Sequence, residues 1–158
     1  VTEVLIIVAP NHAGDFLQLL KSGDAFDMKF SYEIQEHPNG IAESFLLAKN
    51  FIGNDNVALI LGDNIFEDDF SESVKNFTSG AQIFVKEVQD PRAFGVAELD
   101  DENTVLSLEE KPKSPKSNFA QTGLYLCDNS VIQKTENLKP SDRNELEITD
   151  VMKSYLKE

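Results

Sequence analysis

The chain has 158 residues, of which 41% are hydrophobic and 27% charged, and this length is typical of one compact domain. Folding at this size buries roughly 70% of the surface of the extended chain, so neither a disulfide nor a structural metal is needed to hold the fold together. The formal net charge of −14 argues against a groove that follows a nucleic-acid backbone, but it is compatible with a small phosphorylated ligand.

The single cysteine, Cys127, excludes an intramolecular disulfide and any site built from several cysteines, and it is compatible with a reducing cytoplasm. No apolar run approaches the ~20 residues of a membrane span, and no signal-peptide pattern opens the chain. We therefore expect a soluble, cytoplasmic protein that binds neither nucleic acid nor membranes.

The first half of the chain alternates short aliphatic runs with segments of helical spacing. These patterns predict strands over residues 4–9, 28–34 and 57–61 and helices over residues 12–21 and 41–51. The first and third strands are continuously apolar, which is typical of strands covered on both faces. The β-α-β-α-β order predicts an α/β fold with a mainly parallel sheet, helices on both faces and a ligand crevice at the carboxyl ends of the strands. The second helix is expected to bury one apolar stripe: Ile41, Phe45, Leu46, Ala48 and Phe51.

The second half changes character, because several strands follow one another with only turns between them. The expected elements are a helix near 68–77, strands near 81–88, 95–99, 104–110 and 119–126, and helices over 128–136 and 145–157. Consecutive strands joined by turns indicate a mixed or antiparallel extension of the sheet. A basic loop with two prolines spans residues 111–117 of this otherwise acidic chain.

Asp63 is the first candidate for a functional residue. It follows an apolar strand directly, between Gly62 and Asn64, where an open α/β sheet places its ligands. A carboxylate oxygen there suits Mg²⁺ bound to a phosphate, whereas an aspartate that caps the following turn is the simpler alternative. Three more acids at residues 67–69 are more typical of a helix N-terminus than of further metal ligands.

A second candidate lies in the loop after the second strand. Gln35 can offer both a donor and an acceptor to the edge of a nucleobase, and Gly40 permits a close approach of the backbone to a ligand. Ordinary polar surface is the alternative for this loop.

Two further places combine acids with cations. Glu110 can accept sugar hydroxyls while Lys111 meets a phosphate, unless the two form only a surface charge pair. Arg143 could clamp a phosphate and Glu145 could bind hydroxyls, although an ordinary helix start rich in acids has the same pattern. Cys127 follows an apolar strand without a visible activating partner, so we expect it to be a packing residue.

Several other chemistries lack their motifs. The sequence contains neither the dinucleotide fingerprint nor a Walker loop, and it has no nucleophile elbow of a serine hydrolase. His12 and His37 are too isolated in the sequence to indicate a metal pair.

Six segments together closely resemble the sugar-nucleotide pyrophosphorylases, a family of sugar nucleotidyltransferases. They occur in the family's order and at about its spacing: Gln35–Ala42, Leu61–Phe66, Asp90–Val96, Leu108–Pro112, Thr122–Tyr125 and Glu145–Asp150. Each segment alone is a weak signal, but the ordered series covers nearly the whole chain and is highly specific. The nearest resemblance is to the branch of the family that makes dTDP-glucose.

The resemblance implies a fold, a reaction and a set of roles. The fold would be Rossmann-like and GT-A-like, a layered α/β/α arrangement, with residues 1–158 forming a single, partial nucleotidyltransferase domain. The reaction would join dTTP and glucose 1-phosphate into dTDP-glucose and pyrophosphate with the help of Mg²⁺. The implied roles are base binding for Gln35 and Gly40, a Mg²⁺ ligand and catalytic role for Asp63, sugar-phosphate binding for Gly95, Glu110, Lys111, Glu145 and Thr149, and a catalytic phosphate clamp for Arg143.

The chain also departs from the family pattern. The family's glycine-rich loop would precede Val1 and its second metal-binding aspartate would follow Glu158, so the resemblance implies little or no turnover by residues 1–158 alone. A non-catalytic module that binds sugar phosphate or nucleotide is the alternative. We expect a divided sheet, or pairing with a second copy, where the family has its first strand, and a homo-oligomer. Three positions differ from the family and leave the preferred sugar open: Phe94 for tyrosine, Gln121 for a small apolar residue and Asn144 for glycine.

Overall fold

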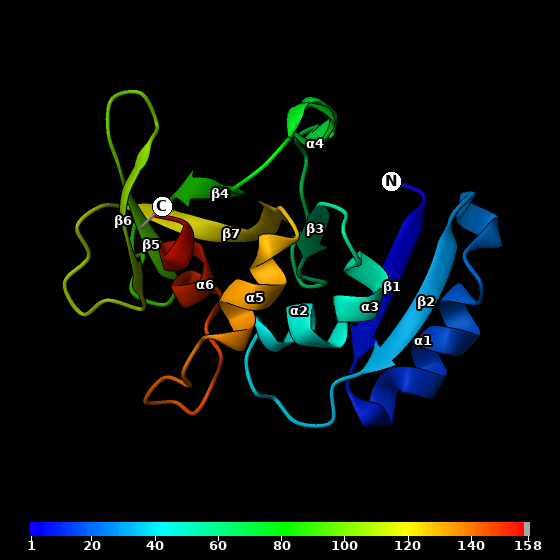
Figure 1. The fold of residues 1–158 in the computed structure, drawn as a ribbon. Helices are drawn as coiled ribbons and strands as arrows, with labels where there is room; N and C mark the ends of the chain where they lie inside the picture. The colour runs from blue at the N-terminus through cyan, green and yellow to red at the C-terminus, as the bar shows by residue number, and fades with distance from the viewer. Residues whose placement is uncertain (157–158) are drawn as a thin grey trace.

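The first two strands form a small parallel sheet of their own. The computed structural model describes residues 1–156, so Lys157 of the last predicted helix lies outside the described residues. Strand β1 (Glu3–Val8) pairs with β2 (Lys29–Ile34), and helix α1 (Ala13–Leu20) connects them and lies beside β2 at one end of the molecule (Figure 1). Short 3₁₀ turns at Pro10–His12 and Asp24–Phe26 flank this helix.

The remaining strands form a five-stranded sheet around the last one. Its members are β3 (Val57–Ile60), β4 (Ala81–Glu87), β5 (Gly95–Leu99), β6 (Val105–Glu110) and β7 (Phe119–Cys127). β3 and β5 follow one another along one edge of β7, and β4 occupies the other edge, all antiparallel to β7. β6 pairs with β5 at the end of the molecule farthest from α1 (Figure 1). The predicted antiparallel extension is therefore confirmed.

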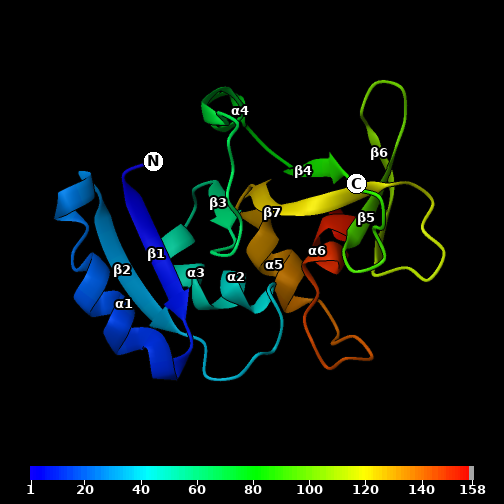
Figure 2. The ribbon, with the colours of Figure 1, turned by 180° about the vertical axis from the view of Figure 1, so that it is seen from behind.

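A mixed α/β fold is confirmed, but parallel pairing within residues 1–156 is confined to β1 and β2, so less of the sheet is parallel than predicted. β3 does not join β1. β1 and β3 lie apart in Figure 2. A 430 Å³ cavity is lined by apolar side chains from both strands, such as Leu5 and Leu59. The expected division of the sheet is thus confirmed. Full burial of these two strands is wrong, because Val8 alone in β1 is buried and Ile60 in β3 is 58% exposed.

The predicted helix over residues 41–51 is interrupted. It becomes α2 (Glu43–Leu47) and α3 (Lys49–Ile52), which are separated at Ala48. Of the predicted stripe, Phe45 and Ala48 are buried, whereas Ile41 and Phe51 are each 39% exposed. Phe51 lines the cavity between β1 and β3, so the open space beside the sheet explains its exposure.

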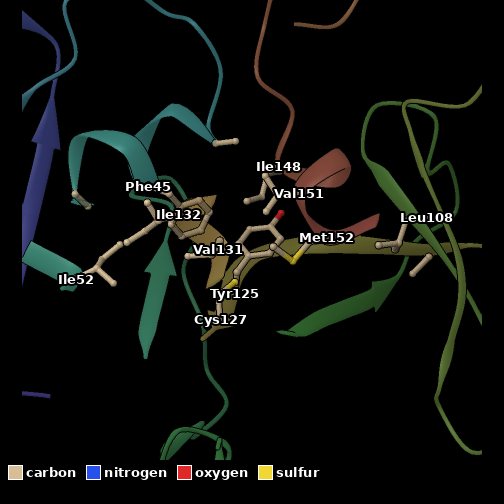
Figure 3. Close-up of a cluster of buried hydrophobic side chains, with 13 residues drawn as sticks. Phe45, Ile52, Leu108, Tyr125, Cys127, Val131, Ile132, Ile148, Val151 and Met152 are labelled. Atoms are coloured by element: carbon tan, nitrogen blue, oxygen red, sulfur yellow. The ribbon is translucent and has the colours of Figure 1, made fainter. Parts of the chain in front are cut away.

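The core lies between the five-stranded sheet and three helices. Helices α2, α5 (Ser130–Glu136) and α6 (Ile148–Tyr155) contact one another in sequence along one side of β7, and the short α4 (Ser71–Asn76) stands apart between β3 and β4 (Figure 1). The side chains that meet in this core include Phe45, Tyr125, Cys127, Val131, Val151 and Met152 (Figure 3). Residues 1–156 contain no helix that combines the length and the apolar character needed to cross a membrane.

Two details of the core bear on the predictions. Cys127 is fully buried, and this burial raises the pKa of its thiol to about 12, which confirms a packing role. The last helix begins at Ile148 rather than at residue 145, because Leu146 N–H donates to the Asn39 carbonyl over 2.6 Å and holds the preceding segment extended.

Candidate functional site

One point on the edge of β7 gathers the ends of three strands. β3 is followed by Leu61, whose N–H donates to the Gly123 carbonyl, and at the start of β5 Val96 pairs with Ala120. Gly123 and Ala120 are three positions apart in β7, which corresponds to roughly 10 Å along the strand. β6 ends with Glu110 paired to Gly95. The loop that carries Asp63 and the end of β6 therefore approach the same stretch of β7, as expected for a crevice where strands end.

Asp63 is exposed, and its neighbour fixes its orientation. Asn64 donates from Nδ2 to Asp63 Oδ1 over 2.7 Å and accepts the Gly123 N–H at its own Oδ1 over 3.0 Å. A Cβ atom on Gly123 would lie 2.7 Å from Asn64 Cγ, so glycine is needed for this contact. The sequence did not indicate Asn64, although an amide directly after a candidate ligand is the signal that could have done so.

A single fixed carboxylate fits Mg²⁺ that reaches the protein with its substrate. Mg²⁺ is usually held by one or two carboxylates together with water and substrate phosphates. Among residues 1–156, no group of three or more His, Cys, Asp or Glu side chains could hold a metal without such help. Of the three acids at residues 67–69, Asp69 acts at a helix start as predicted, because it accepts the Ser71 N–H over 2.9 Å at the start of α4. Hydrogen bonds from Ser71 lower the pKa of Asp69.

Glu110 is held on both of its oxygens. Thr149 donates its hydroxyl to Oε2 over 2.6 Å, and Arg143 reaches Oε1 over 3.5 Å. The Lys111 ammonium lies 4.0 Å from Oε1. Lys111 adopts φ +42, a strained value for a residue with a side chain, and its N–H donates to the Phe94 carbonyl. These features fix the backbone of Lys111, while its side chain is 45% exposed.

Arg143 makes its closest contacts with Glu147. Two guanidinium nitrogens donate to the two Glu147 oxygens over 3.1 and 2.7 Å, Ser141 donates to the same carboxylate over 2.6 Å, and the Glu147 side chain is only 8% exposed. The hydrogen bonds to Glu147 raise the pKa of Arg143. Glu145 is a second partner at 3.3 Å. Asn144, between them, adopts φ +60, a left-handed conformation that asparagine and glycine both tolerate, which explains why asparagine can replace glycine there.

The sequence did not single out Glu147. The sequence pattern that could have pointed to Glu147 is its i, i+4 spacing from Arg143, but this spacing predicts a contact only on a helix. In the structure residues 143–147 are not helical, and the turn around Asn144 brings the two side chains together. A cavity of 820 Å³ opens beside this pair and is lined by both signs of charge, including Glu110, Lys111, Arg143 and Glu147.

The loop between Gln35 and Glu43 is held by its own polar side chains. Gln35 Nε2 donates to the Gly40 carbonyl over 3.2 Å and to Glu43 over 2.7 Å, and Asn39 donates to the same carboxylate over 2.7 Å. Gly40 adopts φ +104 and packs against the backbone of Leu146. A 220 Å³ cavity is lined by both Gln35 and Gly62, so this loop and the loop of Asp63 face one space.

The structure thus places the predicted site residues in two clusters and one separate position. Hydrogen bonds and ion pairs connect Glu110, Lys111, Arg143, Glu145 and Thr149. Gly95 pairs with Glu110 between β5 and β6 and lies against the side chains of Gln121 and Thr149. Gln35 and Gly40 form the second cluster, which joins the first through the backbone of Leu146, since Ala42 N–H donates to its carbonyl over 3.1 Å. Asp63 stands near both and bonds to neither within residues 1–156.

Known proteins resemble this chain over its whole length. The profile of the family described as nucleotidyl transferase matches residues 1–158. A glucose-1-phosphate thymidylyltransferase of Neisseria meningitidis serogroup A is 43% identical over 162 residues, which cover 100% of this chain and 56% of that protein. One from Mycolicibacterium smegmatis is 45% identical over 159 residues, which cover 99% of this chain and 55% of its own length. The chain therefore spans about half the length of the curated relatives it matches.

Solved structures resemble the chain as well. A crystal structure described as a glucose-1-phosphate thymidylyltransferase from Bacillus anthracis, in complex with sucrose, matches with a TM-score of 0.90 and 44% identity over 99% of this chain and 64% of that one. A UDP-glucose pyrophosphorylase complexed with UDP-glucose matches with a TM-score of 0.78 at 22% identity, which shows the fold alone.

Proposed function

Because the chain belongs to the nucleotidyl transferase family, we propose that it serves the reaction of dTTP with glucose 1-phosphate, which yields dTDP-glucose and pyrophosphate. In this reaction a phosphate oxygen of the sugar phosphate attacks the α-phosphorus of the nucleotide, and the bond to the bridging oxygen of the leaving pyrophosphate breaks. The observation that carries the proposal is the side-by-side placement of Glu110, Lys111 and Arg143 at one cavity.

The sugar phosphate would bind at this cavity. A carboxylate accepts hydroxyl hydrogens, so Glu110 would bind sugar hydroxyls, and Lys111 and Arg143 would bind the phosphate. Gly95, Glu145 and Thr149 would complete the site: Gly95 leaves room on β5, Glu145 holds Arg143, and Thr149 holds Glu110.

The base would bind at the loop of Gln35 and Gly40. Both hydrogens of the Gln35 amide nitrogen are already donated, to Gly40 and Glu43, so its Oε1 remains as an acceptor. An acceptor matches the N–H on the edge of a thymine. Asp63 would hold Mg²⁺, which when bound supplies positive charge to the nucleotide phosphates.

We propose two further properties of the whole protein. Exposed apolar side chains on α1, among them Leu17 and Leu19, support a homo-oligomer. The free cysteine supports a cytoplasmic location. A binding module without turnover is the second candidate function, and the cavity lined by Glu110, Lys111 and Arg143 supports it, because charged groups that bind a sugar phosphate do not by themselves supply turnover. Pyrophosphate release from dTTP and glucose 1-phosphate by the full chain separates turnover from binding alone.

Calorimetric titration of the full chain with glucose 1-phosphate tests the proposed sugar site. We expect Glu110→Gln to weaken binding about tenfold or more, because a hydrogen bond to a charged group contributes about 1.5–3 kcal/mol. The matched control is Glu87→Gln at the exposed last residue of β4, which does not line this cavity and should bind as the unaltered chain does. Equal loss in both variants, or no loss in either, contradicts the site.

Replacing Asp63 by asparagine should remove the effect of Mg²⁺ on nucleotide binding. With the unaltered chain, Mg²⁺ is expected to strengthen dTTP binding in calorimetry, whereas with Asp63→Asn the affinities with and without Mg²⁺ should agree within about twofold, because an amide oxygen is a much weaker Mg²⁺ ligand than a carboxylate. Asp68→Asn is the control, since it removes the same charge from the same loop. An unchanged response to Mg²⁺ in Asp63→Asn would exclude this residue as the ligand.

A further inference from the structure

Gln121 occupies a place in the sheet where an amide is costly. It lies in β7 opposite Val85 of β4, its side chain is close to Gly95 of β5, and only 7% of its surface is exposed. Its Nε2 donates to the Thr149 hydroxyl over 3.2 Å, but its Oε1 is buried and has no hydrogen-bond partner among residues 1–156. A buried acceptor without a partner lowers stability, so an apolar side chain would suit the fold better at this position.

The orientation of this amide follows from its neighbours. Thr149 has one hydroxyl hydrogen, and it is donated to Glu110 Oε2 over 2.6 Å, because a carboxylate can only accept. The Thr149 oxygen must therefore accept a hydrogen from Gln121, and only the NH₂ group can supply one. The group without a partner is then the carbonyl of Gln121. The two hydrogen bonds run in one direction, from Gln121 to Thr149 and from Thr149 to Glu110.

The same amide leaves no room for a side chain at position 95. A Cβ atom at this position would collide with Gln121 Nε2 and would lie 2.7 Å from Thr149 Oγ1. The amide thus fills the space beside Gly95 and Thr149, and Thr149 in turn donates to Glu110, which lines the 820 Å³ cavity.

We propose that Gln121 is a positioning residue for Glu110. By donating to the Thr149 oxygen it fixes the direction of the Thr149 hydroxyl, and this hydroxyl holds one carboxylate oxygen of Glu110 while Arg143 approaches the other. A carboxylate fixed in this way discriminates between a sugar that offers hydroxyls and an analogue that lacks them. The inference rests on the proposed function and assigns to it a residue that fold stability alone does not explain.

The test compares Gln121→Met, Thr149→Val and the double variant in the full chain. Methionine preserves the length of the side chain but removes both the donor and the unpartnered acceptor. We expect Gln121→Met to unfold at the same temperature or higher and to bind glucose 1-phosphate about fivefold to tenfold more weakly, with less discrimination against monodeoxy analogues. Affinity for inorganic phosphate should stay within about twofold, because Lys111 and Arg143 are untouched. In the Thr149→Val background, the same change should cause no further loss.

Gln82→Met on the neighbouring strand β4 and Thr135→Val in the buried face of α5 are the matched controls. Equal weakening of phosphate and sugar phosphate by Gln121→Met overturns the inference, since it indicates a general distortion. Additive losses in the double variant also overturn it, because Gln121 would then act independently of Thr149. Unchanged binding by Gln121→Met overturns the inference alone, whereas no binding of glucose 1-phosphate by the unaltered chain overturns the proposed function and the inference with it.

Discussion

Replacing Gly40 by alanine is expected to lower the free energy of unfolding by about 3 kcal/mol. Gly40 adopts φ +104, a backbone conformation that costs a residue with a side chain about 1–3 kcal/mol. The added Cβ would also lie 2.6 Å from the Leu146 nitrogen and 2.9 Å from its carbonyl carbon, and backbone atoms cannot move aside as a side chain would. Urea denaturation followed by circular dichroism measures the change.

The control for this variant is Gly53→Ala. Gly53 also has a positive φ, of +56, but nothing lies within 4 Å of the position its Cβ would take. We expect a smaller loss there, of about 1–2 kcal/mol, from backbone strain alone. The difference between the two variants measures the contact between the loop of Gly40 and Leu146. Equal losses would mean that this contact is absent in solution.

Replacing Arg143 by methionine is expected to damage both stability and binding. Glu147 would remain as a largely buried carboxylate without its main partner. Removing one partner of a fully buried pair costs 3–5 kcal/mol, and because the Arg143 side chain is 41% exposed we expect a smaller loss, about 2 kcal/mol. Affinity for glucose 1-phosphate should fall more than about tenfold, because a cation at the cavity is lost.

A double variant separates the two effects. Adding Glu147→Gln to Arg143→Met removes the stranded charge, so stability should recover while binding stays weak. Arg92→Met is the matched control, because its partner Asp90 is exposed and the pair lies in an exposed loop, so neither property should change. Recovery of sugar-phosphate affinity in the double variant would show that Arg143 acts only through Glu147 and not on the phosphate.

Local patterns in the sequence predict most elements of this fold, but they do not predict which strands pair. The apolar run over residues 57–61 is equally compatible with a strand between two others and with one at an open edge. Its partner, β7, lies more than sixty residues away, and the choice depends on the whole set of strands. The break at Ala48 was missed for a related reason, since helical periodicity continues through it and only the surrounding structure interrupts the helix.

The sequence also predicts where the candidate site residues lie along the strands better than it predicts which side chains contact one another. The strand-end positions of Asp63 and Glu110 can be read from hydrophobic patterning. The role of Glu147 cannot, because Glu145 and Glu147 are similar acids two residues apart. Which of them is buried against Arg143 depends on the extended conformation before Ile148, which a hydrogen bond from Leu146 to the distant Asn39 maintains. Gln121 is visible as an unusual residue, but its unpartnered carbonyl is a property of three-dimensional packing.

The central position of β7 has a consequence for how the molecule folds. β3, β4 and β5 all pair with this strand, yet it follows all three in the sequence, and Val57 pairs with Cys127 across seventy positions. During synthesis the β1–β2 unit can assemble early, whereas the three others have no partner in β7 until residues 119–127 have left the ribosome. Such non-local pairing slows folding. Until β7 is available, the edges of the other strands stay exposed to other chains. The interval before β7 emerges is therefore when this protein most needs protection from aggregation.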